Sequence, residues 1–68
     1  MIVALNGRQA ELPDGATVAD AVQEVGAGGQ SRGVAVAVDG EVVRRTEWTE
    51  TKLKSDQTVE VVRAVQGG

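Results

Sequence analysis

The sequence predicts an α+β fold in which one helix packs across a mixed sheet of about five strands. Two dipeptides, Asn6-Gly7 and Asp39-Gly40, are typical of tight hairpin turns, and an apolar stripe with helical spacing lies between them. Alternation typical of a strand returns near the end, at residues 58–65. At 68 residues the chain is long enough for one small domain.

The first segment is predicted to be a hairpin. Residues 2–5 are apolar and are followed by Asn6-Gly7. This dipeptide suits a type I′ turn because both central positions of that turn need positive φ. The returning strand is expected over residues 9–12, and Pro13-Asp14-Gly15 then forms a turn.

A helix of about two turns is predicted over Val18 to Val25. Thr17 is a suitable N-cap and Asp20 stands at position N3, as in a capping box. Gly26 follows as a natural C′ residue. The buried stripe should consist of the residues at positions i, i+3, i+4 and i+7, namely Val18, Ala21, Val22 and Val25.

The second half should supply three more strands. Residues 26–33 are glycine-rich and predict a loop, and residues 34–38 alternate valine with alanine. This period of two predicts a strand whose valines face the helix. Asp39-Gly40 turns the chain into residues 41–44, and the last strand spans residues 58–65.

The stretch between these strands contains Trp48 and Leu53. We expect it to cover the edge of the sheet, and we expect Trp48 to pack rather than to serve as a binding hot spot, because a small domain needs its large side chains buried.

The predicted element order is strand, strand, helix, strand, strand, strand. Packing one helix on one mixed sheet buries all the apolar stripes together. This arrangement is that of the ubiquitin-like β-grasp. Residues 1–65 are therefore expected to form the domain, and residues 66–68, Gln-Gly-Gly, a flexible tail with nothing to pack.

The composition argues against an enzyme. The chain has no His and no Cys, so imidazole bases, thiol nucleophiles and the common zinc sites are missing. We expect no bound metal or cofactor, and a carrier or interaction module instead. A net charge of −3 with one aromatic residue disfavours nucleic-acid binding.

The apolar run at residues 2–5 is far too short for a signal peptide or a membrane span. We therefore expect a cytoplasmic protein without membrane contact, monomeric when free.

The Gly67-Gly68 pair directly after the final strand is the most informative feature. An α-carboxylate is ionised and unreactive at neutral pH. Transfer of AMP from ATP would make it electrophilic, so Gly68 is the candidate for covalent modification. Gln66 and Gly67 would thread into partner sites, since glycine lacks a Cβ and adopts many φ values.

The sequence resembles the ThiS family, the sulfur carriers of thiamine thiazole synthesis. The similar segments are Val-Ala-Leu-Asn-Gly (3–7), Leu-Pro-Asp-Gly-Ala-Thr-Val (12–18), Gly-Val-Ala-Val-Ala-Val-Asp-Gly-Glu-Val-Val (33–43), Glu-Trp (47–48) and Ala-Val-Gln-Gly-Gly (64–68). Family members often carry Pro where Arg44 stands here.

The resemblance implies a three-step cycle. An E1-like adenylating enzyme (ThiF-type) uses ATP and Mg²⁺ to adenylate Gly68. A persulfide donor, a cysteine desulfurase or a sulfurtransferase, then converts it to a thiocarboxylate. Thiazole synthase (ThiG-type) finally takes the sulfur. The carrier itself performs no catalysis.

A partner-docking face is a further hypothesis. The side of the sheet away from the helix should carry a shallow apolar patch of Ala35, Ala37, Val43 and Val62 near the tail. Such patches often mark partner sites, although a single exposed valine is also ordinary.

Two related functions remain open. A MoaD-like sulfur carrier for molybdopterin synthesis has the same fold and tail, although that family tends to end in a different sequence. A ubiquitin-like protein modifier would instead be joined to lysines. A purely structural interaction module would not need Gly67 and Gly68.

Overall fold

The computed structural model describes residues 1–26 and 33–63. In this part of the chain there are five strands, one α-helix and one short 3-10 helix, in the predicted order. Their bounds are β1 Ile2–Leu5, β2 Arg8–Glu11, α1 Val18–Glu24, β3 Val34–Val38, β4 Glu41–Val43, the 3-10 helix Arg45–Glu47 and β5 Thr58–Arg63.

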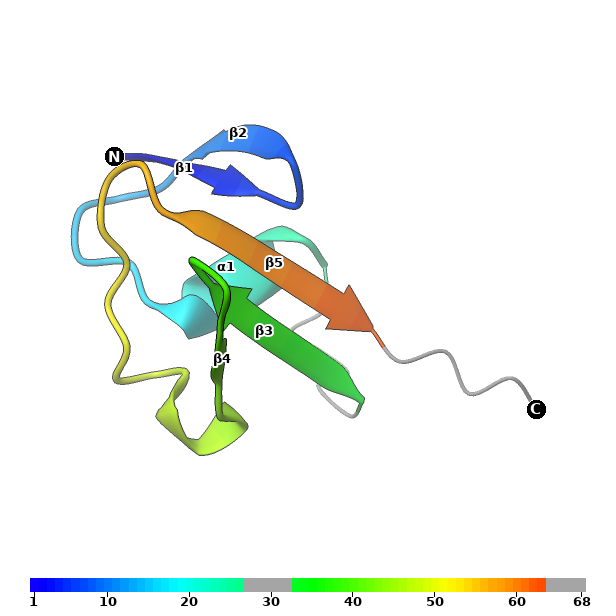
Figure 1. The fold of residues 1–68 in the computed structure, drawn as a ribbon. Helices are drawn as coiled ribbons and strands as arrows, with labels where there is room; N and C mark the ends of the chain where they lie inside the picture. The colour runs from blue at the N-terminus through cyan, green and yellow to red at the C-terminus, as the bar shows by residue number, and fades with distance from the viewer. Residues whose placement is uncertain (27–32, 64–68) are drawn as a thin grey trace.

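The strands form one sheet in the order β2-β1-β5-β3-β4, and α1 lies across one of its faces (Figure 1). β1 and β5 are parallel, whereas the other neighbouring strands are antiparallel. The predicted mixed sheet is therefore confirmed. The last strand in the sequence occupies the centre of the sheet, between the two hairpins.

Both predicted hairpin turns are confirmed. Asn6 and Gly7 have φ values of 53° and 80°, and Asp39 and Gly40 have values of 50° and 86°. Positive φ at both central residues is the mark of a type I′ turn, which matches the twist of the flanking strands. The Asp39 side chain also accepts a hydrogen bond from the Thr58 backbone N–H at 2.9 Å, so this turn is joined to the start of β5.

The N-terminal end of α1 has the predicted capping box. The Asp20 N–H donates to Thr17 Oγ1 at 3.4 Å, and the Thr17 N–H donates to Asp20 Oδ2 at 2.8 Å. The two N–H groups between these residues also have partners: Val18 donates to the carbonyl of Thr51 at 2.9 Å, and Ala19 donates to the carbonyl of Trp48 at 3.1 Å. The segment after β4 therefore completes the cap, and no N–H in this turn is left for a ligand.

The helix ends one residue earlier than predicted. Val25 is its C-cap, and the Gly26 N–H donates to the Gln23 carbonyl while Gly26 takes a φ of 80°. Val25 is 36% exposed, so its assignment to the buried stripe was wrong. The other three members, Val18, Ala21 and Val22, are buried. The apolar spacing continues past the point where the chain leaves the helix.

The core lies between α1 and the inner face of the sheet. Its buried apolar residues come from β1, α1, β3, β5 and the connecting segments and are Val3, Leu5, Leu12, Ala16, Val18, Ala21, Val22, Val36, Trp48, Leu53 and Val59. Val34 and Val38 flank Val36 and are partly buried against the same cluster, which confirms the predicted inner face of β3. Trp48 is 6% exposed, so its predicted packing role is confirmed.

Candidate functional site

The three residues predicted to carry the chemistry, Gln66, Gly67 and Gly68, lie outside the described residues. The structure follows the chain to Arg63, the last residue of β5. What it shows of the candidate site is therefore its base: the end of the central strand and the sheet surface beside it.

The two neighbours of β5 cover different parts of that strand. β3 pairs with β5 from Val38 opposite Val59 to Val34 opposite Arg63. β1 pairs only with the beginning of β5, where Leu5 stands opposite Val59. Figure 1 shows β5 continuing beyond the end of β1.

Asn6 directly follows β1, at the position where the pairing between β1 and β5 ends. Its backbone N–H donates to the Val59 carbonyl at 2.9 Å. Its side chain accepts from the Val61 N–H at 2.7 Å and donates to the Val61 carbonyl at 3.3 Å. Nothing in the local pattern predicted these contacts, because Asn6 and Val61 are 55 positions apart.

The outer face of the sheet carries the predicted apolar patch in part. Ala35 stands directly opposite Val62, and Ala37 opposite Val42. Val62 is 60% exposed and Val42 is 77% exposed. Directly opposed residues share a face of the sheet. We call Ala35, Ala37, Val42 and Val62 the outer patch.

Val43 does not belong to this patch, and its placement there was wrong. It pairs with the buried Val36 and packs, partly buried, against the core. Its carbonyl also accepts a hydrogen bond from Trp48 Nε1 at 3.0 Å. The sequence did contain the signal for this: a two-residue turn at Asp39-Gly40 sets Val38 opposite Glu41, which places Val42 on the outer face and Val43 on the inner one.

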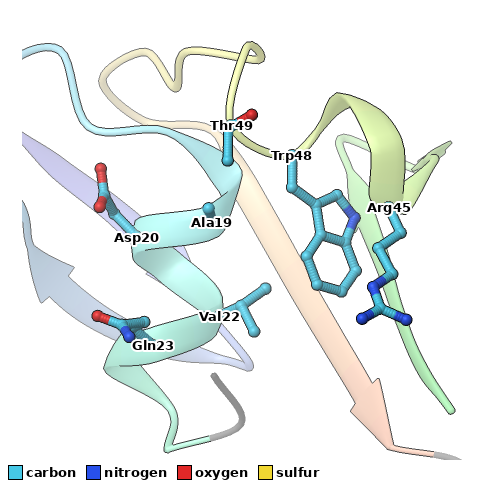
Figure 2. Close-up of a pocket in the computed structure, with 7 residues that line it drawn as sticks. All are labelled: Ala19, Asp20, Val22, Gln23, Arg45, Trp48 and Thr49. Atoms are coloured by element: carbon cyan, nitrogen blue, oxygen red, sulfur yellow. The ribbon is translucent and has the colours of Figure 1, made fainter. Parts of the chain in front are cut away.

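A second surface feature is a hollow of about 330 Å³ between α1 and the segment after β4 (Figure 2). Asp20 lies on the helix side, and Arg45 lies beside the Trp48 ring on the other side. The remaining lining residues are Ala19, Val22, Gln23 and Thr49. The set offers one carboxylate, one guanidinium and the hydroxyl of Thr49 but no imidazole or thiol, so it does not have the usual composition of an active site.

Within residues 1–26 and 33–63, no three carboxylates come together in a way that would hold a metal ion. In the same residues, no helix combines the length and apolar character that crossing a bilayer requires.

Comparison with known proteins agrees with this architecture. The crystal structure of the thiamine biosynthesis protein ThiS from Geobacter metallireducens is similar, with a TM-score of 0.80, 24% sequence identity and full coverage of both chains. This likeness confirms the β-grasp fold. No curated protein matches the chain.

The model of the ThiS family matches residues 3–68. The match includes both hairpins, the helix, the central strand and the terminal glycine pair, so it covers the domain and the candidate site alike. The chain belongs to the ThiS family.

Proposed function

We propose that this chain is a sulfur carrier of thiamine biosynthesis, loaded at the carboxylate of Gly68. The observation that carries the proposal is the family match, which continues from the central strand through Gly67 and Gly68. The β-grasp domain would serve as the handle by which partner enzymes hold the terminus. The same composition that lacks His and Cys leaves the catalysis to those partners.

The loading chemistry begins with an inert carboxylate. An E1-like adenylating enzyme of ThiF type binds ATP and Mg²⁺, and a Gly68 carboxylate oxygen attacks the α-phosphate as pyrophosphate leaves. The acyl-adenylate carries AMP as a good leaving group. No group of the carrier takes part except the terminal carboxylate.

Sulfur then enters from a persulfide held on a cysteine desulfurase or a sulfurtransferase. The terminal sulfur of the persulfide attacks the acyl carbon, and AMP leaves. A thiol reduces the resulting acyl disulfide, which gives the Gly68 thiocarboxylate and a new disulfide. Thiazole synthase of ThiG type would be the acceptor of this sulfur.

The terminal residues suit this series of partners. Gly67 and Gly68 have no Cβ, so a narrow channel can admit them and each site can impose its own φ. Gln66 would enter with them. The cost is the entropy lost when such a segment is ordered on binding.

We further propose that the outer patch is the docking face. It combines apolar side chains of β3, β4 and β5, and it reaches Val62, next to the final described residue. Apolar surface near a reactive terminus would let a partner bind the domain and receive the terminus together. We also propose that the free carrier is a cytoplasmic monomer.

The test is the intact mass of the carrier after incubation with a ThiF-type enzyme, ATP, Mg²⁺, a cysteine desulfurase and cysteine. Replacement of one terminal oxygen by sulfur is expected, and omission of ATP should abolish it. A carrier whose mass never changes would contradict the proposal. Sulfur delivery to a molybdopterin synthase but not to thiazole synthase would instead indicate a MoaD-like role, and isopeptide linkage to lysines a protein modifier.

A further inference from the structure

The end of β5 has a neighbour on one side only among the described strands. β3 pairs with it through Arg63, whereas β1 pairs no further than Val59. An unpaired strand edge normally frays, because its backbone groups have only water as partners. In this molecule, that strand end is followed in the sequence by the last residues of the chain, which include Gly68.

The Asn6 side chain takes the place of the missing strand. In a parallel pair, a residue of one strand donates its N–H to one neighbouring residue and accepts at its carbonyl from another. Val61 would find these partners if β1 continued. Instead, Asn6 Oδ1 accepts from its N–H at 2.7 Å and Asn6 Nδ2 donates to its carbonyl at 3.3 Å.

The chemistry of asparagine explains why one side chain meets both needs. A carboxamide has the same acceptor and donor as a peptide group. Asn6 also adopts a φ of 53°, which asparagine tolerates better than most residues other than glycine. The residue therefore turns the chain away from β5 and extends the parallel pairing by one further step.

We propose that Asn6 is a positioning residue for sulfur loading: it holds the end of β5 in the sheet and thereby fixes the direction in which the chain carrying Gly68 leaves the domain. The inference rests on the proposed carrier function. A fixed exit reduces the number of orientations that the partner enzyme must select, so less order has to be imposed on binding.

Asp39 provides a matched control. It stands at the same position of the other type I′ turn, with a φ of 50°, and its side chain also bonds to β5, at Thr58. Thr58 is at the opposite end of that strand. Asn6→Gly and Asp39→Gly thus both remove a turn side chain that binds β5, and glycine preserves both turns.

The experiment measures adenylation kinetics of the full-length carrier with a ThiF-type enzyme, by pyrophosphate release. We expect Asn6→Gly to raise KM for the carrier about 3- to 10-fold with kcat unchanged, and Asp39→Gly to leave both constants within about twofold of wild type. Loss of stability alone would affect both variants, so the split between them reports positioning.

Amide hydrogen exchange on the free carriers is the second readout. Exchange at Val61 and Val62 should accelerate in Asn6→Gly beyond the change at core amides, but not in Asp39→Gly. If wild-type carrier is adenylated and the two variants have equal KM values, or equal exchange at these amides, the positioning role is overturned. If wild-type carrier releases no pyrophosphate, the carrier function itself is overturned.

Discussion

Trp48 is the single aromatic residue of the chain, and at the scale of one side chain it performs two structural tasks. Its ring is buried with the core residues from α1 and the sheet. Its Nε1 donates to the carbonyl of Val43 at 3.0 Å, which ties the segment after β4 back to the end of that strand. A buried indole N–H normally finds such a partner.

Replacing Trp48 with Phe keeps an aromatic ring but removes the N–H donor and some volume. The Val43 carbonyl loses its partner and a small void forms, so we expect the free energy of unfolding to fall by about 1–3 kcal/mol. Urea unfolding followed by circular dichroism measures this, because the fluorescent probe is lost with the indole. A variant as stable as wild type would show that the bond and the packing contribute little.

Thr17 acts on a single helix terminus. Its Oγ1 accepts from the Asp20 N–H, and α1 spans seven residues, so one cap is a large share of its local stabilisation. We expect Thr17→Ala to lower the free energy of unfolding by about 1 kcal/mol. Thr46→Ala, at an exposed position in the 3-10 helix, is the control and should stay within about 0.5 kcal/mol of wild type. Equal losses in the two variants would contradict the capping role.

At the scale of elements, the register of β4 places two neighbouring residues on opposite faces of the sheet. Val42 and Val43 are adjacent, yet Val42 stands opposite Ala37 on the outer face and Val43 opposite Val36 on the inner face. The alternation of side chains in a strand makes this separation unavoidable once the turn has set the pairing. Docking and core packing can therefore be tested with neighbouring substitutions.

We expect Val42→Asp to leave the free energy of unfolding within about 0.5 kcal/mol of wild type, because Val42 is 77% exposed. The same variant should weaken binding to the adenylating enzyme about tenfold, since a charge would be placed in an apolar contact. Val43→Asp should instead destabilise the fold by about 2–3 kcal/mol, because its carboxylate would face the core. Urea unfolding and titration calorimetry measure the two effects. Unchanged binding by a folded Val42→Asp carrier would remove the outer patch from the proposal.

At the scale of the whole molecule, the sheet order places the last strand between the first and the third. β5 contributes the buried Val59 to the core, so the domain cannot be completed without it. The proposed reactive terminus thus follows the most central strand directly. A partner that held the domain would also hold the base of the proposed reactive terminus.

Deletion of Gly67 and Gly68 separates the domain from its chemistry. The core cluster of the described residues is made by α1, the sheet and the segments that connect them, so we expect urea unfolding of the deletion variant to match wild type within about 0.5 kcal/mol. Loading with AMP or sulfur should be lost completely, as read by intact mass. A deletion variant that still accepts sulfur would show that another group carries it.

The structural features that the sequence predicted correctly depend on local interactions. The Asn6-Gly7 and Asp39-Gly40 turns, the Thr17 cap and the alternation of residues 34–38 each depend on neighbours a few positions apart, and all four are found in the structure. The candidate terminus is also local, because Gly67-Gly68 is visible as a sequence pair.

The tertiary structure decided what depends on distant residues. The end of α1 left Val25 exposed. The inner position of Val43 is different, because the local Asp39-Gly40 turn already sets the register of β3 and β4. The bonds between Asn6 and Val61 exist only because β1 and β5 lie side by side. Propensity and periodicity describe only residues that are close together in the sequence, so they do not predict contacts with a residue from the other end of the chain. For this reason the geometry at the base of the terminus was found only in the folded structure.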